Sequence, residues 1–114
     1  LANKYERGIG VKQSYEMARI LHEQAAQQGD VFGMYRLGVM YANGDGVEQA
    51  YEKAFEYYEQ AAQLGFAKAQ YSLGCMYAKG EGIEHNIATA MKWAKKAAAQ
   101  GDEEAIAQLQ RLKN

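Results

Sequence analysis

Apolar and small residues recur at helical spacing along the middle of the chain. In a first stretch, residues 31–43, they lie at Gly33, Met34, Leu37, Gly38 and Tyr41. In a second stretch, residues 50–64, they lie at Ala54, Tyr57, Tyr58, Ala61 and Ala62. Because steps of three and four positions place side chains on one face of an α-helix, the pattern predicts two helices that each bury one face.

This pattern repeats along the chain at a period of 36 residues. The shift superposes Gly8, Gly44 and Gly80; Gly10, Gly46 and Gly82; Gly29, Gly65 and Gly101; Tyr5, Tyr41 and Tyr77; and Leu1, Leu37, Leu73 and Leu109. A fixed period of this length is typical of proteins in which helix pairs stack on one another. The sequence therefore predicts an all-α fold, a solenoid of antiparallel helix pairs.

Glycines and acidic residues mark the boundaries between the predicted units. A glycine follows the second helix of each unit, where a left-handed residue ends a helix without a Cβ penalty. Asp30 and Asp102 come directly after such glycines and suit the start of the next helix. The predicted units are a truncated first repeat at 1–29, repeats at 30–65 and 66–101, and a polar capping helix at 102–114.

The glycine pair between the two helices of each unit resembles the start of a phosphate-binding loop. A dinucleotide-binding loop needs a third glycine and a preceding strand, but Val47, Glu48 and Gln49 follow the middle pair and the preceding segment is helical. A Gly-Lys-Ser/Thr sequence is absent as well. We expect a structural turn instead, in which Gly44 ends the first helix and Gly46 takes a second positive φ.

The repeated residues also carry a family resemblance. In the third unit they are Ala69, Leu73, Gly74, Tyr77, Gly80, Gly82, Ile83, Ala90, Trp93, Ala97, Ala98 and Gly101. This pattern resembles the Sel-one-like repeat (SLR) family, a branch of the tetratricopeptide superfamily, whereas ordinary tetratricopeptide repeats have a period of about 34 residues. The resemblance covers nearly the whole chain. One departure is that the aspartate expected to open the second helix is Ser14, Ala50 or Asn86 here.

The resemblance implies a right-handed α/α superhelix that works as a protein-interaction scaffold or adaptor. Some cysteine-rich SLR proteins bind or hydrolyse β-lactams, but those members carry paired cysteines in each repeat. Here Cys75 is the only cysteine. A β-lactam-binding or β-lactam-hydrolysing repeat protein is therefore kept only as a lesser alternative.

Composition narrows the classes of function. The net charge is −1, with 13 Lys and Arg against 14 Asp and Glu, so nothing draws the chain to nucleic acid or an anionic membrane. No long apolar run predicts membrane insertion. One thiol excludes an internal disulfide and favours a reducing compartment such as the cytoplasm, although an upstream signal would lie outside this sequence.

Catalytic and metal-binding patterns are also missing from the sequence. His22 and His85 have no second ligand at metal-binding spacing, and the nucleophile motifs Ser-x-x-Lys and Gly-x-Ser-x-Gly do not occur. We expect a non-catalytic protein without metal or cofactor.

A candidate partner-binding groove follows from the angle between successive helical residues. At about 100° per residue, one stripe on the first helix of each unit lies opposite the core positions 34, 37 and 41. Its residues are Phe32, Arg36, Val39, Asn43, Lys68, Ser72, Cys75, Lys79, Glu104, Gln108 and Arg111, with Asn3 and Arg7 from the first unit. Basic residues outnumber the single acid, and Phe32 and Val39 are apolar. We therefore expect the stripe to line a concave groove for an acidic or C-terminal peptide segment.

Two other interpretations of the stripe and of the array stay open. The stripe is also compatible with a plain solvated face. The array as a whole is compatible with a structural spacer or an oligomerising segment, which self-associates through the edge of its truncated first unit. In that interpretation the chain begins inside a helix, because Leu1 aligns with Leu37, and the natural protein is expected to be longer.

Overall fold

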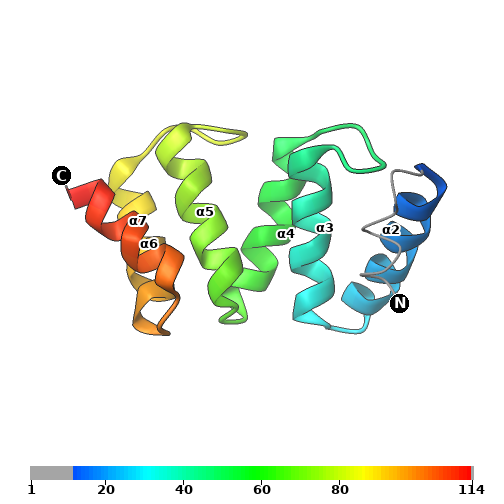
Figure 1. The fold of residues 1–114 in the computed structure, drawn as a ribbon, viewed down its shortest axis with the longest axis horizontal. Coiled ribbons are helices and arrows are strands. Elements are labelled where there is room, and N and C mark those ends of the chain that lie inside the picture. Colours follow the sequence, from blue (N-terminus) through cyan, green and yellow to red (C-terminus); the bar gives the residue numbers. More distant parts are fainter. Residues whose placement is uncertain (1–11, 114) are drawn as a thin grey trace.

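Six α-helices occupy residues 12–113, the part of the chain that the computed structural model describes. They are α2 (Lys12–Gln27), α3 (Val31–Asn43), α4 (Tyr51–Gln63), α5 (Ala67–Lys79), α6 (Ile87–Ala99) and α7 (Glu103–Lys113). In Figure 1 the helices follow one another along the long axis from α2 to α5, with α7 drawn over α6 at the C-terminal end, and the molecule is elongated, with extents of 43 × 24 × 22 Å. No strand occurs in the described range. The predicted all-α fold is confirmed.

The helices of the middle unit begin and end close to the predicted positions. The first coincides with the expected 31–43, and the second is one residue shorter at each end than the expected 50–64. Ala50 has an extended backbone, with φ −149° and ψ 97°, so it stands just before α4 instead of inside it. The expectations that concern Leu1, Tyr5, Gly8 and Gly10 lie outside the described residues.

The glycine pair between the paired helices forms a tight turn. Gly44 has a φ of 75° and Gly46 a φ of 72°, which side chains with a Cβ rarely adopt. The backbone N–H of Gly44 donates to the carbonyl oxygen of Met40 at 2.8 Å and closes the end of α3. Gly80 and Gly82 have φ values of 75° and 72° in the next unit. The structural turn predicted from the sequence is confirmed.

Side-chain caps begin most of the helices for which a cap was expected. Asp30 Oδ1 accepts a hydrogen bond from the backbone N–H of Phe32 at 3.0 Å, and Asp102 Oδ1 accepts from Ala105 at 2.9 Å. Asn86 Oδ1 caps α6 by accepting from the backbone N–H of Thr89 at 3.0 Å. Ala50 makes no such bond at the start of α4.

The core runs along the row of helices, because the extensive contacts join helices that are consecutive in the chain. Leu37 and Leu73, one period apart, are 1% and 0% exposed and are among the largest fully buried side chains. Met40 is fully buried as well. The units at 30–65 and 66–101 therefore bury the same leucine in a matching place, as a stacked repeat requires.

Glycines also allow close approach between neighbouring elements. A Cβ added to Gly38 would lie 2.7 Å from the ring of Tyr58, so α4 reaches α3 only because this position has no side chain. A Cβ added to Gly46 would overlap the side chain of Tyr15 on α2, and one at Gly82 would lie 2.5 Å from the Cβ of Tyr51 on α4. The turns at Gly46 and Gly82 thus each rest against the second helix of the unit before them.

Candidate partner-binding surface

Phe32 lies in a cluster of aromatic rings that links three successive units. Its ring is edge-on to Phe66 at 6.5 Å and to His22 at 6.4 Å, measured between ring centroids. Tyr35, one residue from the predicted stripe, contacts Phe66 at 5.2 Å and Tyr58 at 5.8 Å. Phe32 keeps 39% of its surface exposed. The cluster therefore presents part of one aromatic ring to solvent.

The other stripe residues of α3 differ in how far they reach solvent. The guanidinium carbon of Arg36 lies 5.9 Å from the centroid of the Tyr35 ring, and the residue is half-buried. Burial lowers the pKa of Arg36, but an arginine stays charged in proteins. Val39 packs against the core, while Asn43 is exposed and donates to Asp45 at 3.4 Å.

Lys68 is held by two carboxylates of the next unit. Its Nζ lies 3.0 Å from Asp102 Oδ2 and 2.8 Å from Glu104 Oε1. Hydrogen bonds to Glu104 and then to Asp102 raise the pKa of Lys68 above its ordinary value. Burial alone would raise the pKa of Asp102, but the N–H of Ala105 and the Lys68 ammonium lower it. The charge of Lys68 is therefore largely balanced within the molecule.

The middle of the stripe on α5 and α7 belongs partly to the packing between helices. Ser72 Oγ donates to the carbonyl oxygen of Lys68 at 2.9 Å, and Gln108 Nε2 donates to Cys75 Sγ at 3.1 Å. Gln108 is only 4% exposed, and its Oε1 has no hydrogen-bond partner. Gln108 thus fills space between α5 and α7 instead of lining an open groove.

Lys79 and Arg111 are exposed near the ends of α5 and α7. Within residues 12–113, neither Lys79 nor Arg111 takes part in an ion pair. Asn3 and Arg7 lie outside the described residues. The stripe is thus less uniformly basic than the sequence pattern indicated.

Two features of this surface were missed by the sequence analysis. Phe66 and Tyr35 complete the aromatic cluster, and Asp102 is a partner of Lys68. A signal existed for the first: Phe66 stands where the neighbouring units have Asp30 and Asp102, so an aromatic residue replaces a helix cap. At Phe66 the side chain caps nothing and instead packs across the joint.

The described residues offer no metal cluster and no membrane segment. Within residues 12–113, no group of three His, Cys, Asp or Glu side chains is placed to hold an ion. None of the helices there is both long and apolar enough to cross a membrane. His22 is buried, and burial lowers its pKa, with Asp30 acting in the opposite direction.

Stacked antiparallel helix pairs with a 36-residue period define an α-solenoid repeat protein. The Sel1 repeat model matches residues 1–30, 31–66 and 67–102, and the chain therefore belongs to the Sel1 repeat family. Proteins of this family are generally protein-interaction scaffolds without catalytic activity. No curated protein matches the chain.

Three solved structures have a similar solenoid fold. A Sel1 repeat protein from Oxalobacter formigenes is 31% identical at a TM-score of 0.85, over 95% of this chain and 44% of that one. A protective antigen of uropathogenic Escherichia coli strains, with an SLR fold, is 28% identical at 0.70, over 92% and 27%. Cysteine-rich protein B of Helicobacter pylori is 29% identical at 0.78, over 82% and 71%. The chain thus spans less than half of the first two proteins.

Proposed function

We propose that the protein is a non-catalytic scaffold that binds a peptide or protein segment on the surface formed by α3, α5 and α7. The observation that carries the proposal is the part-exposed side chain of Phe32, one helical turn before Arg36 on α3. Aromatic residues and arginine are the side chains that most often anchor protein interfaces. Membership of a family of interaction scaffolds supports the same function.

The partner is expected to place an apolar side chain on Phe32 and a carboxylate near Arg36. Lys79 and Arg111 extend the basic character toward the ends of α5 and α7. Lys68 contributes less, because Asp102 and Glu104 already accept its hydrogen bonds. The ligand is therefore a segment with few acidic groups, as opposed to a long acidic run.

Charge reversal at Arg36 tests this surface. Peptides selected on the wild-type protein from a random display library would be measured by fluorescence anisotropy against Arg36→Glu. We expect at least one class of peptides to lose roughly tenfold or more in affinity, the usual effect of losing a charged hydrogen-bond partner. Lys68 is a poor test site, since reversing it would repel Asp102 and loosen α7.

Lys92→Glu is the matched control, because Lys92 is an exposed residue of α6, outside the stripe. It makes the same change in net charge and should leave binding unaltered. Thermal unfolding of both variants would verify that they fold. If every selected peptide bound Arg36→Glu as tightly as wild type, the proposed surface would be wrong.

A further inference from the structure

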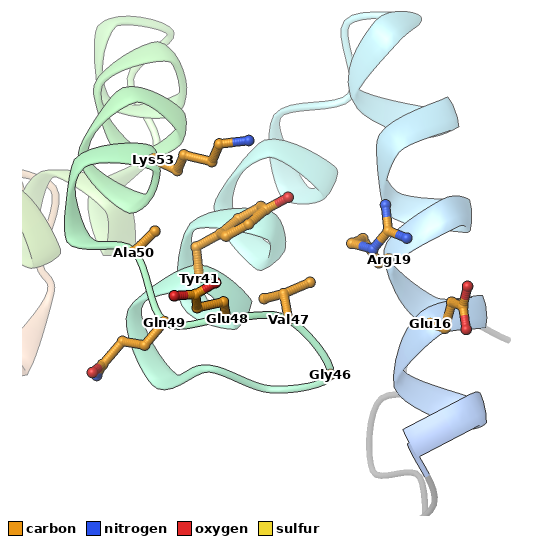
Figure 2. A pocket seen from close by; sticks show the side chains of 9 residues that line it. All are labelled: Glu16, Arg19, Tyr41, Gly46, Val47, Glu48, Gln49, Ala50 and Lys53. Atoms are coloured by element: carbon orange, nitrogen blue, oxygen red, sulfur yellow. The ribbon is translucent and has the colours of Figure 1, made fainter.

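A hollow of about 640 Å³ opens between α2 and α4, the second helices of two successive units. Its walls carry Arg19 on α2 and Lys53 on α4, and Tyr41 at the end of α3 lies between them (Figure 2). The segment from Gly46 to Ala50 forms one edge. Tyr41 belongs to the side of α3 opposite the Phe32 stripe, so this hollow is separate from the proposed scaffold surface.

A second hollow of about 340 Å³ lies between the same two helices, where Ala26, Leu37 and Tyr57 provide apolar lining. Two residue pairs connect the hollows, with one member of each pair in each hollow. Tyr41 stacks on Tyr57 at 5.9 Å with an interplanar angle of 12°, and Arg19 forms an ion pair with Glu23 at 3.2 Å. The two hollows therefore lie next to each other along α2 and α4, and together they are called the α2–α4 groove.

The repeat itself supplies a comparison for this groove. One period after Arg19 stands Phe55, and one period after Tyr41 stands Tyr77. At that next junction the ring of Phe55 packs edge-on against Tyr77 at 5.8 Å. Arg19 turns to Glu23 instead of covering Tyr41. The same fold thus holds an aromatic side chain at one junction and leaves polar space at the other.

Hydrogen-bond donors line both walls of the groove. Figure 2 shows the amine of Lys53 and the hydroxyl of Tyr41 turned toward the space between α4 and α2, with Arg19 on α2 across from them. Lys53 Nζ lies 5.3 Å from the centroid of the Tyr41 ring, and one period later its place is taken by Thr89. Such donors suit a carboxylate, since charge-assisted hydrogen bonds are the strong ones.

Acidic residues limit how much negative charge the groove accepts. Glu16 and Glu48 lie near its loop end, and Glu23 lies beside Arg19. A second carboxylate in a bound ligand would approach one of these three. The groove therefore fits one carboxylate, with apolar contact beyond it on Ala26 and Tyr57.

We propose that the α2–α4 groove binds an extended peptide segment that carries a single acidic residue and an apolar residue about three positions away. The acidic side chain lies between Arg19 and Lys53. From Arg19 to Ala26, α2 rises about 10 Å at 1.5 Å per residue, which is roughly three residues of extended chain. This second binding site goes beyond the scaffold surface and does not depend on it.

Arg19→Phe is the sharpest test, because it copies the residue that the next junction already accommodates at this position. Peptides selected from a random display library on the wild-type protein would be measured against Arg19→Phe, Arg19→Gln and Arg36→Glu. We expect a class of peptides with one acidic residue to lose roughly tenfold or more in affinity on both Arg19 variants. Arg36→Glu should leave that class unchanged.

Replacing the acidic residue of such a peptide by its amide should cause a similar loss on the wild type and little further loss on Arg19→Gln. The proposal is overturned if no selected peptide depends on Arg19, or if the dependent peptides lack an acidic residue. Because the two sites respond to different variants, failure at Arg36 leaves this test intact, and the reverse holds as well.

Discussion

Ala50 is a single residue whose side chain leaves the start of α4 incompletely capped. Its backbone already has the extended conformation of a helix cap, but an alanine has no oxygen to accept a hydrogen bond from the first turn. One period later, Asn86 has nearly the same backbone angles and accepts from Thr89. The geometry for a cap is therefore present at Ala50 and only the acceptor is missing.

Ala50→Asp should raise the free energy of unfolding by about 1 kcal/mol, the usual value of a helix cap. Urea unfolding followed by circular dichroism would measure the change. Asn86→Ala provides the converse, with an expected loss of similar size. Unchanged or lower stability of Ala50→Asp would mean that the start of α4 is not a cap position.

His22 makes stability depend on pH at the residue scale. The side chain is 3% exposed, and burial lowers its pKa below the ordinary value of 6.5, despite the opposing effect of Asp30. The folded state therefore favours the neutral imidazole. The contribution of the neutral His22 side chain to stability is fully present above pH 6.5. It is lost as the pH falls from there through the lower pKa of the folded state.

The wild-type protein should thus lose more stability than His22→Gln between neutral and mildly acidic pH. Glutamine keeps polar atoms at this position but does not titrate there. Urea midpoints of both proteins on either side of pH 6.5 would provide the measurement. Asp102 does not interfere, because its pKa is lowered, so its contribution to stability is kept near neutral pH and is lost mainly as the pH falls below 3.8. Equal pH dependence of the two proteins would contradict a role for His22.

At the scale of elements, successive joints of the solenoid use different chemistry at matching positions. Phe32 packs against Phe66 at one joint, and Lys68 pairs with Asp102 and Glu104 at the next. Phe32 and Lys68 are one period apart, as are Phe66 and Asp102. An aromatic contact has thus been exchanged for an ionic one, which makes the docking of α7 more sensitive to salt.

Lys68→Gln should weaken the docking of α7 by less than about 1 kcal/mol, because both ends of the ion pair with Glu104 are partly exposed. Hydrogen exchange of the α7 amides would report the change. The effect should be present in dilute buffer and largely absent at about 1 M salt. Lys95→Gln, on the exposed side of α6, is the control. A salt-independent loss would show that Lys68 acts through packing and not through charge.

Features that depend on residues close together in the sequence were easier to predict than features that depend on distant helices. Helix ends, the Gly44–Gly46 turn and the caps at Asp30 and Asp102 depend on residues a few positions away, so the sequence pattern indicated them correctly. The role of Phe66 and the burial of Gln108 depend on helices about one period away. A stripe drawn on one helix could not show that its neighbour covers part of it.

At the scale of the whole molecule, repetition makes distant residues energetically equivalent. Leu37 and Leu73 occupy matching buried places, and among the helices α2 to α7 the extensive contacts join consecutive ones. In such an array, stability is approximately a sum of terms from units and from their joints. Equal substitutions in different units should therefore have similar costs.

Leu37→Ala and Leu73→Ala should each lower the free energy of unfolding by about 2–5 kcal/mol, the range for large-to-small substitutions in a core. Urea unfolding of the two variants would compare the losses directly. Leu64→Ala is the control, since Leu64 is 62% exposed and its truncation should have little effect. A clear difference between the two core variants would contradict the equivalence of the units.

The contact of Gly46 with Tyr15, and of Gly82 with Tyr51, bears on the curvature of the molecule. At these contacts only the glycine backbone separates a turn from the helix of the preceding unit. The distance between turn and helix, and with it the tilt of one unit against the next, therefore depends on the absence of a side chain. A methyl group at either glycine would push the turn away from the helix that it contacts and change the angle between the two units. Because tilts add up along a stack, one such change would displace the far end of the rod and alter the shape offered to any ligand that spans several units.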